Sequence, residues 1–195
     1  MSGPLPLRFV LSAPSVGQLP PSRAEVAVVG RSNVGKSSLL NALGNRKALA
    51  HVSKTPGRTQ LLNCFEVTDG ATVIDCPGYG FASVPGRVRA TWQQMIEGYL
   101  LEREPLEMVV VLVDGEIGPT KLDVTMLGWL RSHTVAHSVV ATKADKVKSS
   151  QRERRKREVA AGCDLLPSDI VWVSATKGTG VEALRRHVRL WLHLG

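Results

Sequence analysis

Short apolar runs alternate with amphipathic stretches along most of the chain. The runs 25–29, 108–113 and 170–173 are rich in valine, and none of them exceeds six residues. Runs of this length and composition are typical of strands buried on both faces of a parallel sheet. Because helical patterns separate them, the alternation predicts an α/β fold with a mostly parallel sheet and helices on both faces.

Six strands and five helices are predicted in this way. The segment 61–74 predicts a hairpin around Asp69-Gly70, which places one antiparallel strand in the sheet. The predicted strands are 25–29, 61–67, 71–74, 108–113, 138–141 and 170–173. The predicted helices are 37–43, 89–103, 121–131, 149–161 and 180–194. Segments 44–60 and 78–88 are polar or punctuated by glycine and proline, and are predicted as loops.

The first 23 residues differ from the rest in their proline content. Five of the eleven prolines lie there, which predicts an extended arm and excludes a helix. Residues 24–195 show no repeat, linker or low-complexity tract, so they are predicted to form one domain.

Composition and charge narrow the classes of protein. None of the apolar runs approaches the roughly 20 residues that span a bilayer, and the N-terminus lacks a secretory apolar region, so a cytoplasmic protein with no membrane partner is expected. The three cysteines form no CxxC pair, which argues against a disulfide framework. A net charge of +8 favours an anionic polymer such as RNA as a partner, although many basic proteins bind no nucleic acid.

A phosphate-binding loop follows the first strand of the predicted domain. Residues 30–37, GRSNVGKS, match the pattern GxxxxGK[ST] between a strand and a helix, as the mechanism of a P-loop requires. Its glycines let backbone N–H groups face a polyphosphate. Lys36 is predicted to reach the β- and γ-phosphates, and the Ser37 hydroxyl to bind Mg²⁺.

Two further motifs predict a metal-binding carboxylate and a sensor of the γ-phosphate. Asp75 ends a predicted strand, where a carboxylate can hold Mg²⁺, and the N–H of Gly78 can bond a γ-phosphate oxygen. Thr55 and Thr59 compete as the second hydroxyl ligand, and Thr59 is preferred because it lies next to the following strand. A solvated loop threonine is the alternative.

Two loops near the C-terminus predict recognition of guanine. Residues 142–145, TKAD, follow a predicted strand, and Asp145 can accept hydrogen bonds from guanine N1–H and N2, which adenine cannot supply. The Lys143 stem can cover the base face, and Ser174-Ala175-Thr176 can offer backbone N–H groups to guanine O6. Four motifs in order at strand ends predict GTP rather than ATP as the ligand, in a P-loop NTPase G domain.

These motifs together resemble the EngB family (also called YihA or YsxC) of bacterial GTPases. The resemblance rests on GRSNVGKS (30–37), TPGRTQ (55–60), DCPGYG (75–80), TKAD (142–145) and SAT (174–176), and it extends to the arm around residues 9–13. It implies binding of GTP or GDP with Mg²⁺, and a role in assembling the large ribosomal subunit through rRNA and ribosomal proteins. It also implies a link to cell division and septation. Cys76 replaces the leucine usual in DLPG, with little effect expected because this position offers mainly its backbone.

Two residues bear on the rate of hydrolysis. Tyr79 stands where Ras-like GTPases place a water-orienting glutamine, so slow intrinsic hydrolysis is predicted. Asn33 resembles the P-loop asparagine of K⁺-activated GTPases, which makes K⁺ a candidate cofactor, while a purely structural role of Asn33 stays open. The predicted catalytic residues are Lys36, Asn33 and Thr59, and the predicted metal ligands are Ser37, Thr59 and Asp75. The predicted nucleotide-binding residues are Gly30, Arg31, Ser32, Asn33, Val34, Gly35, Lys36, Ser37, Gly57, Arg58, Thr59, Gln60, Asp75, Cys76, Pro77, Gly78, Thr142, Lys143, Ala144, Asp145, Ser174, Ala175 and Thr176.

Other interpretations of the same residues remain open. The run 152–158 carries five basic and two acidic side chains, and either contacts rRNA phosphates or forms a solvated helix face. A nucleotide-gated binding module that hardly turns over is the alternative to an active GTPase. A small-molecule P-loop kinase is a second alternative, but it gives no reason for the Asp145 loop. A monomer is expected.

Overall fold

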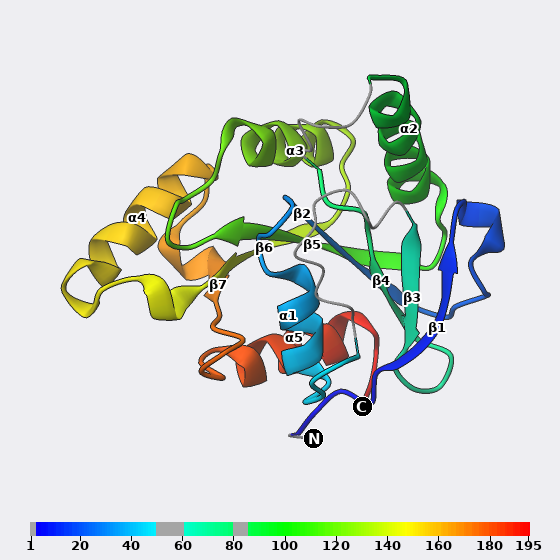
Figure 1. Cartoon of the computed structure of the whole chain (residues 1–195), viewed down its shortest axis with the longest axis horizontal. Helices are drawn as coiled ribbons and strands as arrows, with labels where there is room; N and C mark the ends of the chain where they lie inside the picture. Colours follow the sequence, from blue (N-terminus) through cyan, green and yellow to red (C-terminus); the bar gives the residue numbers. More distant parts are fainter. Residues whose placement is uncertain (1–2, 50–60, 80–85) are drawn as a thin grey trace.

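Seven strands form a single sheet in the computed structural model, which describes residues 3–49, 61–79 and 86–195, with side chains in the last range from residue 94 onward. The order across the sheet is β1-β3-β4-β2-β5-β6-β7 (Figure 1). The strands are β1 (Arg8–Ala13), β2 (Glu25–Gly30), β3 (Leu62–Glu66), β4 (Thr72–Asp75), β5 (Leu106–Asp114), β6 (His137–Thr142) and β7 (Ile170–Trp172). The helices are α1 (Lys36–Leu43), α2 (Gly86–Glu102), α3 (Lys121–Ser132), α4 (Arg152–Gly162) and α5 (Val181–Trp191).

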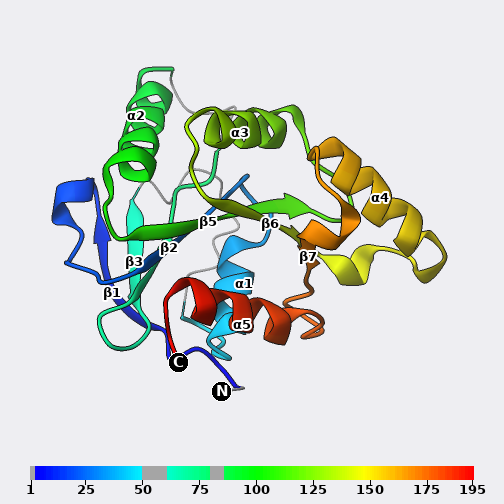
Figure 2. The same cartoon turned by 180° about the vertical axis from the view of Figure 1, so that it is seen from behind.

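Helices cover both faces of the sheet, as the alternation of apolar runs predicts. Helices α2, α3 and α4 lie on one face, and α1 and α5 lie on the other (Figures 1 and 2). Successive residues of a strand point to opposite faces. In β2, Val26 and Val28 therefore join the core beneath α1 and α5, whereas Ala27 and Val29 join the core beneath α2, α3 and α4.

The predicted fold class is confirmed, but the count of six strands is wrong because the arm adds a seventh. Strand β1 pairs antiparallel with β3 at the edge of the sheet, with an irregularity between Phe9 and Leu11. The Phe9 ring packs edge-on against the Phe65 ring, with 5.7 Å between the ring centroids. Since β3 also runs antiparallel to β4, while β4 runs parallel to β2, β3 alone runs against the other described strands, as predicted.

Several predicted boundaries shift by a few residues. Helix α2 begins at Gly86, three residues before the predicted start, and α5 ends at Trp191 rather than at residue 194. A 3₁₀ turn over Ser149–Gln151 precedes α4, where a continuous helix was expected. Helix ends depend on local capping, which periodicity alone does not report. Among the described residues, the helices are too short or too polar for any of them to cross a membrane.

Candidate functional site

The predicted motifs meet at one edge of the sheet. Strands β2, β4, β5, β6 and β7 pair in parallel, either directly or through a shared neighbour. Their carboxyl ends therefore point the same way, and the phosphate loop, Asp75 and the two base-recognition loops all follow such ends. Ligands of open α/β sheets bind at this edge.

Backbone angles, close packing and a side-chain hydrogen bond define the conformation of the phosphate loop. Asn33 has a φ of 61° and Gly35 a φ of 108°, so the chain turns sharply before α1 begins at Lys36. A Cβ added to Gly30 would lie 2.9 Å from Val34 Cγ1, so only glycine fits where the loop leaves β2. The hydroxyl of Thr142 donates to the Val34 carbonyl at 2.6 Å and thereby fastens the loop to β6. Thr142 is buried, so its side chain positions the phosphate loop.

Asp75 is a buried carboxylate, and one of its two oxygens accepts no hydrogen bond from the described residues. Its side chain is almost fully buried, with Lys36 Nζ 3.8 Å from Oδ1 and Asn63 Nδ2 donating to Oδ2 at 3.4 Å. Burial raises the pKa of Asp75, while Lys36 and Asn63 lower it in part. Oδ1 accepts no hydrogen bond from any described group. The carboxylate of Asp75 and the hydroxyl of Ser37, which follows Lys36 at the start of α1, are hard oxygen donors that suit Mg²⁺.

The segment after β4 lies against the phosphate loop. Tyr79 donates its N–H to the Gly30 carbonyl at 3.2 Å and accepts a hydrogen bond from the Ser32 N–H at 3.2 Å. A Cβ on Gly78 would lie 3.1 Å from Ser32 N, so glycine permits this approach. Pro77 precedes it, and Cys76 is fully buried with its N–H bonded to the Val28 carbonyl, which agrees with a backbone role for that position. Gly78, the predicted γ-phosphate sensor, thus lies beside the phosphate loop.

The two loops predicted to read guanine are joined to each other. Ser174 is buried and donates its hydroxyl to Asp145 Oδ1 at 2.5 Å, and this hydrogen bond lowers the pKa of Asp145. The Ser174 hydroxyl also accepts from the Lys177 N–H and lies 3.1 Å from Thr176 Oγ1. Ala144 donates its N–H to the Val173 carbonyl at 3.0 Å. Asp145 itself is exposed, and its lowered pKa keeps it ionised at neutral pH, as an acceptor for a base must be.

Lys143 is fixed beside this pair of loops. Its backbone has a φ of 56°, and its Nζ lies 2.7 Å from Asp114 Oδ2 at the end of β5. Asp114 is buried, and its other oxygen accepts the N–H groups of Glu116 and Ile117. The ion pair holds the lysine stem in place, consistent with a stem that covers the base. Ala175, between Ser174 and Thr176, contributes only backbone and a methyl group.

Four predicted residues lie outside the described part of the chain, and three others were missed. Gly57, Arg58, Thr59 and Gln60 fall in the segment 50–60, as does the alternative Thr55. The missed residues are Asn63, Asp114 and Asp123, which support predicted ones from other elements. Asp123 alone carried a local signal, because Thr120 three residues before it forms a capping box with it.

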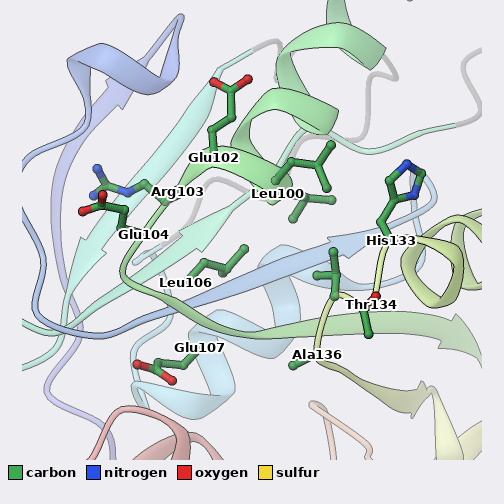
Figure 3. A pocket seen from close by; sticks show the side chains of 11 residues that line it. Leu100, Glu102, Arg103, Glu104, Leu106, Glu107, His133, Thr134 and Ala136 are labelled. Atoms are coloured by element: carbon green, nitrogen blue, oxygen red, sulfur yellow. The ribbon is translucent and has the colours of Figure 1, made fainter.

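Hollows of different size lie on the described surface, and two of them bear on the site. One of about 320 Å³ adjoins the phosphate loop and is lined by Arg31, Ser32, Tyr79, Thr120, Lys121 and Leu122. The other, of about 450 Å³, opens where α2 leads into β5, and its lining includes Glu102, Arg103 and His133 (Figure 3). None of the motif residues lines the second hollow, whereas Arg31 and Ser32 of the phosphate loop line the first.

Comparison with known sequences gives a consistent set of relatives. The family model described as a 50S ribosome-binding GTPase matches residues 25–143. A probable GTP-binding protein EngB of Desulforamulus reducens is 46% identical over 95% of this chain and 92% of its own length. A probable GTP-binding protein EngB of Escherichia coli O157:H7 is 43% identical over 95% of this chain and 90% of its own.

Solved structures agree with these sequences. The crystal structure of a probable GTP-binding protein engB matches with a TM-score of 0.71 and 25% identity, over 87% of this chain and 99% of that one. Era bound to MgGDPNP and nucleotides 1506–1542 of 16S ribosomal RNA matches with a TM-score of 0.65 and 25% identity, over 86% of this chain and 56% of that one.

Proposed function

The chain belongs to the EngB family of GTP-binding proteins, and from this premise we propose that it is a GTP-driven switch that assists assembly of the large ribosomal subunit. Its GTPase domain hydrolyses GTP to GDP and phosphate. The observation that carries the proposal is the gathering of four nucleotide motifs at one sheet edge, where their loops bond to one another. Family membership also motivates a role in cell division and septation, in the cytoplasm.

The phosphate end of the nucleotide is assigned to the loop after β2. Backbone N–H groups of residues 30–37 and the Lys36 ammonium bind the β- and γ-phosphates, and the N–H of Gly78 contacts the γ-phosphate. The open Oδ1 of Asp75 and the Ser37 hydroxyl would hold Mg²⁺, and Thr59 is proposed as a further ligand. When bound, Mg²⁺ neutralises charge on the phosphates. The MgGDPNP in the Era complex supports this assignment.

The guanine end is assigned to Asp145 and its neighbours. The Ser174 hydroxyl occupies one lobe of Oδ1 and keeps the carboxylate ionised and oriented, leaving acceptor capacity for guanine N1–H and N2. Adenine would leave this carboxylate unpaired, which a site of this kind rejects strongly. The site therefore selects GTP over ATP.

Hydrolysis by the isolated protein is proposed to be slow. The hydroxyl of Tyr79 donates to Asp123, so its single proton is not free to orient a water molecule. Asn33 lies exposed in the phosphate loop and is proposed to help bind K⁺. Single-turnover hydrolysis in K⁺ buffer should then exceed that in Na⁺ buffer. Equal rates in the two buffers would reject the K⁺ site but leave the GTPase assignment in place.

The partner is proposed to be the large ribosomal subunit or its precursor, with rRNA and ribosomal proteins as contacts. The description of the matching family as a 50S ribosome-binding GTPase motivates the large subunit. The Era complex, which holds 16S ribosomal RNA of the small subunit, supports only the broader idea that a protein of this fold can bind rRNA. The net charge of +8 suits an RNA surface.

Co-sedimentation with purified large subunits tests the switch. Protein loaded with a non-hydrolysable GTP analogue should pellet with the particles, and protein loaded with GDP should remain mostly in the supernatant. A parallel single-turnover assay should show faster GTP cleavage when the particles are present. Equal sedimentation in both nucleotide states, together with unchanged cleavage, would contradict the proposal, and unchanged cleavage alone would favour a gated binding module.

A further inference from the structure

One buried carboxylate joins three parts of the candidate site. Asp123 lies in the first turn of α3 and is completely buried. Its Oδ2 accepts the N–H of Thr120 at 2.7 Å and the Thr120 hydroxyl at 2.8 Å, which closes the capping box of α3. A capping box needs only this one oxygen. The charge and the second oxygen of Asp123 serve other elements.

The second oxygen binds the segment that follows the γ-phosphate sensor. Tyr79 donates its hydroxyl proton to Asp123 Oδ1 at 2.8 Å. Burial and the charge of Asp123 raise the pKa of Tyr79, so the phenol stays protonated and keeps this bond at any ordinary pH. Tyr79 directly follows Gly78 in the chain. A ring held in place therefore also restricts where the Gly78 N–H can lie.

The charge of Asp123 also faces the phosphate loop. Arg31 Nε lies 3.2 Å from Asp123 Oδ2, and this buried nitrogen has no hydrogen-bond partner among the described groups. Asp123 is completely buried while the Arg31 side chain is 22% exposed, so the buried carboxylate depends on Arg31 for a nearby positive charge. Arg31 directly follows Gly30, whose carbonyl accepts the Tyr79 N–H, so the phosphate loop and the sensor are tied through both backbone and side chains.

We propose that Asp123 is a positioning residue that holds the γ-phosphate sensor against the phosphate loop and thereby sets the preference of the protein for GTP over GDP. The tie keeps the Gly78 N–H close to the loop before the nucleotide arrives, so little ordering remains when the γ-phosphate binds. GDP lacks the group that this N–H contacts and gains nothing from the tie. The inference rests on the proposed role of Gly78.

Two variants remove the tie in different ways. Tyr79→Phe deletes the hydroxyl that binds Asp123 and keeps the ring. Asp123→Asn removes the charge that faces Arg31 while keeping a similar shape. Loss of a hydrogen bond to a charged group should weaken binding of a GTP analogue about tenfold, with GDP affinity changed less than about twofold.

Thr120→Ala is the matched control. It removes one bond to the same Asp123 oxygen and weakens the cap of α3, but leaves the contacts to Tyr79 and Arg31 in place. Its melting temperature should fall because the cap of α3 is weakened. Its ratio of GTP-analogue to GDP affinity should stay within about twofold of the wild type.

The measurement is the ratio of the dissociation constants for guanosine 5′-(β,γ-imido)triphosphate and GDP, by calorimetry on folded protein with Mg²⁺. A tenfold shift in Tyr79→Phe and Asp123→Asn but not in Thr120→Ala supports the inference. An unchanged ratio in both test variants overturns it, as does an equal shift in the control. Wild-type protein that binds neither nucleotide would instead refute the proposed function.

Discussion

Asp75 shows at the scale of a single residue how a binding group can oppose folding. The carboxylate is buried, and burial raises its pKa because the charged form is poorly solvated there. Lys36 at 3.8 Å offsets only part of this effect. The open Oδ1 is useful only when a cation or an ordered water reaches it.

The raised pKa predicts a gain in stability when Asp75 is made neutral. A carboxyl whose pKa is higher in the folded chain favours folding when protonated, and that contribution is lost as the pH rises through the folded pKa. At neutral pH, Asp75→Asn should therefore raise the melting temperature of the nucleotide-free protein by a few degrees. The gain should shrink as the pH is lowered toward 4, because the raised pKa lets more of the wild-type acid become protonated.

The same substitution should weaken the dependence of nucleotide binding on Mg²⁺. GTP affinity of the variant should change little between buffers with Mg²⁺ and with chelator, whereas that of the wild type should fall without the metal. Thermal denaturation and calorimetry measure the two effects. A variant that is less stable at pH 7 and still Mg²⁺-dependent would contradict this account of Asp75.

Motif residues could be predicted because their roles depend on local sequence. The glycines and Lys36 of the phosphate loop act within eight consecutive residues, and Asp145 lies next to the strand that presents it. Asn63, Asp114 and Asp123 were missed because each supports a residue from another element. Such pairings depend on the packing of distant segments, which one sequence without its fold does not reveal.

At the scale of elements, a buried network joins β2 to α2. Glu25 is completely buried, and the Nε and Nη2 of Arg103 donate to its two oxygens at 3.1 Å each. Tyr99 and Thr72 donate their hydroxyls to the same carboxylate. Arg103 also donates to the Pro20 carbonyl at 2.6 Å, so the network ties the N-terminal arm to the domain.

This network predicts a large loss of stability when Arg103 is removed. Arg103→Met should lower the free energy of unfolding by about 3 to 5 kcal/mol, because a buried carboxylate loses its charge partner. Arg8→Met, which breaks the exposed ion pair with Glu66, should cost less than about 1 kcal/mol. Urea denaturation compares the two. Similar losses in both variants would contradict a special role for the buried pair.

The sheet order also explains which element the sequence could not place. Residues 8–13 include the apolar run 9–11 but show no strict alternation, and the prolines around them indicated only an extended arm. Their pairing with β3 depends on an edge that exists only after the hairpin has joined the sheet. The helices and inner strands were predictable because the spacing of apolar residues within each segment reports which of its faces is buried.

At the scale of the whole molecule, the positive charge gathers on α4 and the segment before it. Arg154 and Arg155 pair with Glu158, and Lys156 pairs with Glu153. Arg152 and Arg157 are exposed, and no ion pair to either is found among the described residues. These two arginines are therefore the ones best placed to contact RNA phosphates.

Reversing both charges should weaken ribosome binding in a salt-dependent way. Arg152→Glu/Arg157→Glu should reduce affinity for large subunits, and the slope of affinity against salt concentration should become shallower because fewer counterions are released. Arg46→Glu/Lys47→Glu changes the net charge equally at another exposed site. If both double variants bind alike, the effect is one of net charge and α4 is a solvated face.

The most direct test of the central claim is the purine preference of Asp145→Asn, measured by calorimetry with GTP and xanthosine triphosphate. The wild type should strongly prefer GTP. The variant should lose GTP affinity by about a hundredfold or more and gain affinity for the xanthine nucleotide, because an amide can donate to the xanthine 2-oxygen. An unchanged preference for GTP would show that Asp145 does not read the base and would contradict the assignment of the site.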